Sequence, residues 1–542
     1  MKKIKLLALV LVLAMVCSVF VGCKGKKQDV SNSDALTYWV TIPLASQRTH
    51  TSFNDMMMYK EICKATGVDV EFIHPSSGTE FTEGFQILLA SSEYPDIIEY
   101  DWSSYVGGPD QAINDNVIIS LNDYLEEYAP NYYDCMEGER GKEVDYKYKA
   151  DAISFDGNYY GFKALNIGSY RGYAGLYVRK DMLDKWNLDV PETIDEWDVV
   201  FETAKKNGVD VPLTGLISLF GISSGPAFNS AWDVGKGLYV DKGTVKFGPF
   251  ESAYKDYVTK MAEWFKKGYV DIDYVTNANE NVHSYMTNGK SVAAWGYVGG
   301  DLGALLPAMI DRNPNYNLAA CPFPVMNKGD IPKFQPVQQR ADEPCAAISV
   351  QCGEKNKDRY IDAIKWCDYM YSEEGLVLKC FGVEGETFTF GKDEKGVERY
   401  LYTNKIKEPK EIKGATTVAD ALFYYMRPAN APGFNQHPDY FNGFYPYDQQ
   451  KEAIETWNKY AEIADAYSLP YTLPFTADES SEIAEIKAKC DMNLDAAVSN
   501  ILLGRASADT YDKAISDAKK GGYDKLIEIY QDAYDRYISR IE

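Results

Sequence analysis

Apolar residues in the first part of the chain follow two different spacings. At 36–41, 68–72 and 96–100 they alternate with polar residues or form short runs, as is typical of strands. Between these segments, at 58–67 and 81–89, they recur every three or four residues, as on one face of a helix. This order of strand, helix, strand, helix and strand predicts a parallel sheet covered by helices.

The same two patterns continue toward the C-terminus. Further strands are predicted at 175–178, 291–295 and 346–350, and further helices at 193–204, 254–265 and 359–371. Thr193 and Glu196 form a capping box, which marks the start of one of these helices. From Gln450 onward the chain is rich in helix-forming residues. The predicted fold class is therefore α/β with a helix-rich C-terminal region.

The predicted strand ends suggest where a ligand would bind. In a parallel sheet, ligands bind beyond the carboxyl ends of the strands, where this chain has Trp39, Asp101 and Trp102. An indole ring can pack on the apolar face of a sugar while a neighbouring carboxylate accepts hydrogen bonds from its hydroxyls. Core packing of the two tryptophans and turn capping by Asp101 are the alternatives, and both stay open.

The N-terminus carries the features of an export signal. Three lysines precede an uncharged apolar run from Leu6 to Val21, which is too short for a typical spanning helix. Gly22 and Cys23 follow, and residues 20–23 resemble a bacterial lipobox, in which the signal is cut before the cysteine and the cysteine is lipidated. We expect a signal peptide at 1–22, a lipidated tether at 23–35, and a protein held on the outer face of the cell membrane. An uncleaved anchor or an ordinary signal is the alternative.

Charge and aromatic content narrow the class of partner. The formal net charge of −24 argues against nucleic acid, because its phosphates would be repelled. The chain has 42 tyrosines and 9 tryptophans, whose flat rings can stack on sugars, although large secreted proteins are often rich in tyrosine. The composition therefore argues against nucleic acid and is compatible with a sugar ligand.

No enzyme or metal motif stands out. The eight cysteines after Cys23 are dispersed without zinc spacing, the four histidines form no HExxH, and there is no phosphate-binding loop. We expect no metal, no cofactor and no catalytic residue, and buried free thiols at Cys63, Cys367 and Cys380. Ser223 lies in a G-x-S-x-G match, but Pro226 follows at once and no helical stripe does, so a nucleophile elbow is not supported.

Several short motifs occur in a specific order. They are Glu93–Ile98 (EYPDII), Gly175–Asp181 (GLYVRKD), Val190–Trp197 (VPETIDEW), Asn288–Trp295 (NGKSVAAW), Ser372–Gly375 (SEEG) and Gly382–Gly385 (GVEG). Together they resemble the sugar-type extracellular solute-binding proteins of bacterial ABC importers, in particular a lipoprotein group from Gram-positive bacteria. The resemblance covers residues 36–542. The chain departs from the family in its longer C-terminal region and in Trp295, which stands where a methionine is usual.

The resemblance implies a two-lobed periplasmic-binding-protein-like fold with crossing hinge strands that closes on its ligand. Lobe one is expected at 36–165 and 292–340, and lobe two at 170–290 and 345–542. It also implies a monomeric, non-enzymatic protein that captures an oligosaccharide and delivers it to the permease of an ABC transporter. A peptide or other small solute as ligand, or a secreted glycoside hydrolase, is the alternative. The sequence does not name the sugar, the permease or the role of the C-terminal helices.

The remaining candidate ligand contacts follow from this layout. They are Tyr170 and Arg171 at the first crossing, Trp232 in a loop of lobe two, Trp295 and Tyr297 after a strand, Asp342 near the second crossing, and Arg427. Each has an ordinary alternative, such as a solvated loop, partial burial or a turn at a helix start. For Asp342 and its neighbours Arg340 and Glu343, the alternative is a salt bridge between the lobes.

Overall fold

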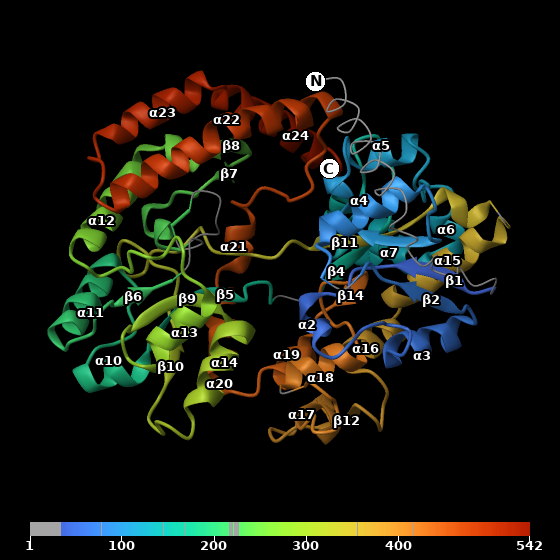
Figure 1. The fold of residues 1–542 in the computed structure, drawn as a ribbon, viewed down its shortest axis with the longest axis horizontal. Helices are drawn as coiled ribbons and strands as arrows, with labels where there is room; N and C mark the ends of the chain where they lie inside the picture. The colour runs from blue at the N-terminus through green and yellow to red at the C-terminus, as the bar shows by residue number, and fades with distance from the viewer. Residues whose placement is uncertain are drawn as a thin grey trace, which may run out of the picture. The chain divides into compact units, whose positions relative to one another are not determined.

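A computed structural model describes residues 34–76, 78–144, 146–167, 170–215, 220–221, 227–354, 356–415 and 417–541 (Figure 1). The chain divides into Met1–Ala35 and the folded unit Leu36–Glu542, and only the second is considered below. The predicted signal peptide and Cys23 lie outside the described residues.

The first lobe is built on a six-stranded sheet with the order β14-β4-β11-β3-β1-β2. Its strands are β1 (Leu36–Trp39), β2 (Val70–Ile73), β3 (Ile97–Tyr100), β4 (Phe162–Asn166), β11 (Ala341–Ile348) and β14 (Gly433–Asn435). β1 pairs in parallel with both β2 and β3, which confirms the parallel sheet predicted from the N-terminal pattern. The predicted helix at 58–67 ends at Gly67, whose φ of 70° favours glycine.

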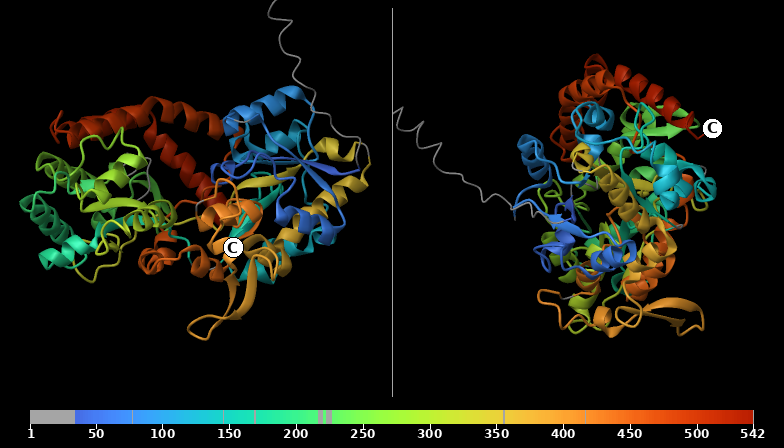
Figure 2. Two further views of the ribbon diagram at one scale, coloured as in Figure 1. Left: turned by 60° about the horizontal axis from the view of Figure 1, so that its bottom comes forward. Right: turned by 90° about the vertical axis from the view of Figure 1, so that its right-hand side faces the viewer.

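Helices of the first lobe surround this sheet. They are α2 (Leu44–Gln47), α3 (Met57–Thr66), α4 (Phe81–Ser91), α5 (Gly108–Asn114), α6 (Leu125–Tyr128), α7 (Pro130–Glu137), α8 (Glu139–Lys142), α9 (Lys147–Ala152), α15 (Asp358–Asp368), α16 (Glu373–Phe381), α17 (Asn404–Lys407), α18 (Val418–Tyr425) and α19 (Pro438–Phe444). A hairpin of β12 (Phe388–Lys392) and β13 (Glu398–Tyr402) projects from this lobe in both views of Figure 2.

The second lobe is built on a four-stranded sheet with the order β10-β5-β9-β6. The strands are β5 (Ala174–Arg179), β6 (Leu213–Thr214), β9 (Ala293–Tyr297) and β10 (Leu318–Ala320), with a separate hairpin of β7 (Leu238–Asp241) and β8 (Thr244–Phe247). Its helices are α10 (Lys180–Trp186), α11 (Ile194–Lys206), α12 (Ser252–Lys266), α13 (Asn279–Thr287), α14 (Gly303–Met309) and α20 (Asp448–Asn458). The predicted capping box is present at the start of α11.

Short helical turns complete the two lobes. They are η1 (Trp102–Ser104), η3 (Phe228–Trp232), η4 (Gly248–Phe250), η5 (Val298–Leu302), η6 (Val350–Gly353) and η7 (Tyr369–Tyr371).

The strand pairing corrects the predicted lobe boundaries. β9 lies between β5 and β6, with Trp295 opposite Leu176, so the segment from 292 to 320 belongs to the second lobe. β11 lies between β3 and β4, with Ala341 opposite Leu165, so the chain from 341 to 435 belongs mainly to the first. The expected assignment of these two segments was therefore wrong. Local apolar patterns predict that a strand exists, whereas its sheet is decided by distant pairing partners.

The C-terminal region is rich in helix, as predicted. Its helices are α21 (Ala461–Asp465), α22 (Ala477–Leu502), α23 (Thr510–Lys520) and α24 (Tyr523–Ile538), drawn in red in Figure 1. Leu494, Val498 and Leu526 join the apolar core beneath the second sheet. Near the end of the chain, Ala533 and Tyr537 pack instead against Ala150 of α9, in the first lobe.

The eight described cysteines are all free thiols. Cys367 and Cys380 are buried, as predicted, and Cys63 is half-buried. Burial raises the pKa of the Cys367 thiol well above its ordinary value, so this group stays protonated and unreactive.

Candidate functional site

Three segments of chain join the two sheets. They run from β4 to β5, from β10 to β11, and from β14 to α20, whose Trp457 donates a hydrogen bond to the Cys321 carbonyl at 3.1 Å. This arrangement gives the crossing hinge segments that were expected. Residues at the ends of the two sheets beside these segments are the candidates for contact with a ligand held between the lobes.

The first lobe presents a group of carboxylates at the end of β3 and the start of β11. Asp101 caps η1 by accepting hydrogen bonds from the Ser103 amide at 3.1 Å and the Ser104 hydroxyl at 2.7 Å, as the turn-capping alternative predicted. Asp342 is half-buried, and burial together with the charge of Asp101 raises the pKa of its carboxyl. These side chains form the acidic edge of the first lobe, defined here as Asp101, Asp342 and Glu343.

A buried lysine compensates one of these carboxylates. Glu343 forms an ion pair with Lys163, and Tyr160 donates a hydrogen bond to the same carboxylate oxygen at 3.2 Å. The Lys163 ammonium also lies 4.7 Å from the centre of the Tyr160 ring. Lys163 pairs with Glu343, and the other two members of the edge, Asp101 and Asp342, are half-buried.

Tyr471 is a component of this region that sequence reasoning missed. Its ring is 61% exposed, and it lies in the loop between α21 and α22. The neighbouring Thr472 hydroxyl donates to the Asp151 carbonyl of α9 at 3.0 Å, so this loop lies against the first lobe. Partial burial raises the pKa of the Tyr471 phenol, and the charges of Asp101, Asp342 and Glu343 raise it further. The only local signal was its position between two prolines, in Leu469-Pro-Tyr-Thr-Leu-Pro474, which interrupt any helix there.

In the second lobe, Trp232 lines an open pocket of about 180 Å³. The residues around it are Ser230, Ala231, Asp233, Val325, Met326, Asp330 and Ile331. Trp232 is half-buried and packs edge to face on Tyr257, with 5.6 Å between ring centres. One side of the indole is therefore fixed by the core while the other borders solvent, which is the geometry that a stacking platform requires.

Trp295 and Tyr297 form a second aromatic surface in this lobe. Both side chains project from the same face of β9, and their rings meet edge to face at 5.3 Å. Trp295 is half-buried and Tyr297 is 54% exposed. Tyr297 lies opposite Ala174, the first residue of β5, so this surface is adjacent to the first crossing.

The structure places other predicted contacts in the core. Trp39 and Trp102 are 4% and 0% exposed and pack around Phe85, which favours the core-packing alternative for both. Arg427, 2% exposed, forms a bidentate ion pair with Glu99 at 2.7 and 2.8 Å. None of these three side chains offers a free surface to a ligand in this conformation.

The residues at the first crossing are occupied by hinge contacts. Arg171 is buried and donates to Asp465 of α21 at 3.0 Å and to the Gln338 carbonyl of the second crossing at 3.1 Å. Tyr170 is half-buried with its ring 5.6 Å from that of Phe441. Arg171 thus joins the crossing segments to one another, which explains its position without a ligand.

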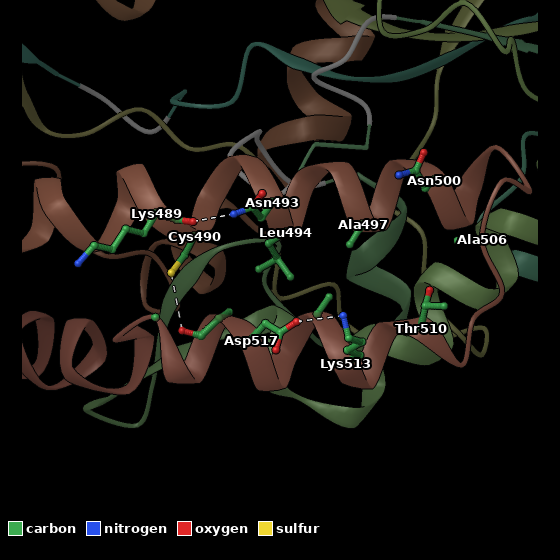
Figure 3. A pocket seen from close by; sticks show the side chains of 13 residues that line it. Lys489, Cys490, Asn493, Leu494, Ala497, Asn500, Ala506, Thr510, Lys513 and Asp517 are labelled. Atoms are coloured by element: carbon green, nitrogen blue, oxygen red, sulfur yellow. Dashed lines mark hydrogen bonds and ion pairs between the residues drawn. The ribbon is translucent and has the colours of Figure 1, made fainter.

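A larger groove lies elsewhere, between α22 and α23 (Figure 3). It has a volume of about 490 Å³ and is lined by small and polar side chains such as Asn493, Ala497, Ala514 and Asp517, with no aromatic ring. It therefore lacks aromatic surfaces of the kind found at Trp232 and at Trp295 with Tyr297. Among the described residues there is also no cluster of side chains suited to a metal ion, and no helix long and apolar enough to cross a membrane.

Comparisons with known proteins agree with this architecture. The sequence model of the family described as bacterial extracellular solute-binding protein matches residues 51–376. The fructooligosaccharide ABC transporter substrate-binding protein FusA of Streptococcus pneumoniae is 28% identical over 210 residues, 35% of this chain and 37% of FusA. The polygalacturonan/rhamnogalacturonan-binding protein YtcQ of Bacillus subtilis is 24% identical over 307 residues, 53% of this chain and 56% of YtcQ. The match thus spans about a third of one relative and about half of the other.

Solved structures share the fold over nearly the whole chain. A solute-binding protein of Bifidobacterium longum infantis that binds HMO has a TM-score of 0.71 at 17% identity, covering 94% of this chain and 99% of that one. The alginate-binding protein AlgQ2 gives 0.68 at 19% identity, and S. pneumoniae FusA in complex with kestose gives 0.65 at 18%, each covering 93% of this chain and 99% of the other. At these identities the likeness establishes the two-lobed α/β fold.

Proposed function

Because this chain belongs to the bacterial extracellular solute-binding proteins, we propose that it captures an oligosaccharide outside the cell and delivers it to the permease of an ABC transporter. The observation that carries the proposal is the pair of partly exposed aromatic surfaces on the second lobe, at Trp232 and at Trp295 with Tyr297. Across the hinge segments, the first lobe supplies carboxylate acceptors and the Tyr471 ring. Stacking surfaces combined with hydroxyl acceptors are the chemistry that recognises a sugar.

The proposed mechanism is closure driven by contacts that differ between two states. A sugar docks first on an aromatic surface of the second lobe, and its hydroxyls then donate to Asp101 and Asp342 of the first. These second contacts form only when the lobes approach each other, so bound ligand favours the closed state. The closed state is the one presented to the permease.

We further propose that the protein is a monomer anchored to the outer face of the membrane by a lipid on Cys23. The sequence Phe20-Val-Gly-Cys23 after an apolar run supports this anchor. In a Cys23→Ala variant, incorporation of labelled fatty acid is expected to disappear and the protein to move from the membrane fraction to the medium. Retention of label would place the lipid elsewhere.

Thermal unfolding of residues 24–542 against a panel of oligosaccharides, with each mixture also analysed for products, tests the function. A selective rise in Tm with intact glycan is expected, because binding to the native state stabilises it. Consumption of a glycan would identify a hydrolase instead. A rise with peptides but not with glycans would keep the fold and change the ligand.

Replacing Trp232 by alanine is expected to weaken oligosaccharide binding by about 2 kcal/mol, or roughly 30-fold in Kd, as for other buried aromatic contacts in binding sites. Isothermal titration of the glycan identified by the panel measures this effect. Trp186, a half-buried tryptophan at the end of α10, gives a matched control, since its replacement by alanine should affect stability and leave Kd unchanged. Equal Kd values for wild type and Trp232→Ala would remove Trp232 from the site.

A further inference from the structure

The C-terminal helix α24 contacts both lobes through different parts of its length (Figure 1). Its first half belongs to the second lobe. Leu526 is buried in the core of that lobe, and the Tyr523 ring packs on Phe247 of β8 with 4.4 Å between ring centres. The Gln531 side chain accepts a hydrogen bond from the Val245 amide at 2.7 Å and donates one to the Gly243 carbonyl at 3.0 Å. Gln531 thus pairs with the backbone of the β7–β8 hairpin.

The last turn of α24 and the residues after it belong to the first lobe. The Tyr537 hydroxyl donates to the Asp151 carboxylate of α9 at 2.8 Å. Arg540 donates to the carbonyls of Ile153 at 3.0 Å and Ala150 at 3.4 Å, and also to that of Ser154. Carbonyls at a helix C-terminus lack partners within the helix, and a cation placed there satisfies them. Arg540 therefore caps α9 from outside.

The two anchors are close together on one rigid element. Gln531 and Tyr537 are six residues apart, which is about 9 Å along a helix axis. Between them, Arg536 donates to the Pro474 carbonyl at 3.0 Å and pairs with Glu479 of α22 at 2.6 Å, which holds the last turn of α24 against the start of α22. The lobes cannot move apart beside α24 without breaking one set of contacts.

From these contacts we infer that α24 is a strap between the lobes, which limits how far they separate when no ligand is bound. The three crossing segments provide the hinge itself, and the strap adds a fourth connection outside it. Its contact with the second lobe includes the apolar core, whereas its contact with α9 consists of hydrogen bonds and a small apolar cluster around Ala533 and Tyr537, so the α9 contact can break without unfolding either lobe. The strap therefore sets the range of motion around the hinge.

Small-angle X-ray scattering of the ligand-free full chain tests the strap. The double variant Tyr537→Phe/Arg540→Met removes the hydrogen bonds to α9 while keeping most of the side-chain volume, and its radius of gyration is expected to exceed that of wild type. Lys525→Met is the matched control on the same helix, because Lys525 is exposed and pairs with Glu528 of its own turn. The control is expected to retain the wild-type radius.

A second variant and a spectroscopic measurement separate release of the strap from loss of folding. Gln531→Ala removes the hydrogen bonds to the hairpin but leaves Tyr523 and Leu526 in the core of the second lobe, so it is expected to keep the wild-type radius. The double variant is expected to have a near-ultraviolet circular dichroism spectrum like that of wild type. A wild-type radius in the double variant would overturn the inference, as would an equal increase in Lys525→Met. The readout uses no ligand, so its outcome is independent of the proposed sugar-binding function.

Discussion

Replacement of Arg427 by methionine is expected to lower the free energy of unfolding by about 3–5 kcal/mol, the usual effect of removing one partner from a buried ion pair. Arg427 and Glu99 are both nearly inaccessible to solvent, and their bidentate contact is surrounded by the hydroxyls of Tyr38 and Tyr59, at 2.8 and 2.9 Å. Without the guanidinium, the Glu99 carboxylate remains buried with the Tyr38 hydroxyl as its hydrogen-bond donor. Denaturation with urea, followed by tyrosine and tryptophan fluorescence, measures the change.

The double variant Glu99→Leu/Arg427→Met provides the control. It removes both charges, so it is expected to be more stable than Arg427→Met alone, because no uncompensated carboxylate remains. Without urea, where the variant is folded, Arg427→Met is expected to bind oligosaccharide as wild type does. Wild-type stability combined with lost affinity would contradict the structural role and return Arg427 to the ligand site.

The stability of the protein is expected to depend on pH through the buried carboxyl of Asp151. Burial raises the pKa of this group from an ordinary 3.8 to about 7. The groups facing it are the Tyr537 hydroxyl of α24, the Ala341 amide of β11, and the more distant charges of Lys163 and Asp465. The folded state therefore keeps a proton that the unfolded chain loses near pH 4.

This difference in proton binding determines how the free energy of unfolding changes with pH. The stabilisation is fully present below about pH 4 and is lost as the pH rises toward about 7, at up to about 1.4 kcal/mol for each pH unit. Asp151→Asn retains a hydrogen-bonding side chain but cannot ionise. Urea denaturation from pH 4.5 to 8 measures the free energy of unfolding of both proteins. Wild type is expected to lose stability relative to Asp151→Asn as the pH rises. Parallel curves for the two proteins would show that Asp151 titrates normally.

Features determined within a short stretch of chain could be predicted from the sequence. The first three strands and the helices between them follow from apolar spacing, and the capping box of Thr193 and Glu196 fixes the start of α11. The exchange of β9 and β11 between the lobes could not be predicted in this way, because a strand's sheet depends on pairing with partners more than a hundred residues away.

The candidate site was predictable in part for a similar reason. The positions of Trp39 and Trp102 at strand ends were correct, but strand position does not determine whether a side chain turns toward solvent or folds back onto Phe85. Trp232 and Tyr297 lie on accessible surfaces, and their contact with ligand stays a prediction. Tyr471 was missed because it comes from a C-terminal loop that is brought to the first lobe only by the folded chain.

The strand order of the first sheet has a consequence for how an exported chain reaches its folded state. β4 lies between β11 and β14, so the sheet is incomplete until residues 433–435 have joined it. The second sheet needs only residues 174–320. A chain that becomes available N-terminus first therefore exposes the edge of β3 until its partner β11 arrives, and such an unpaired strand edge is prone to aggregation. The second sheet can assemble before the first is complete.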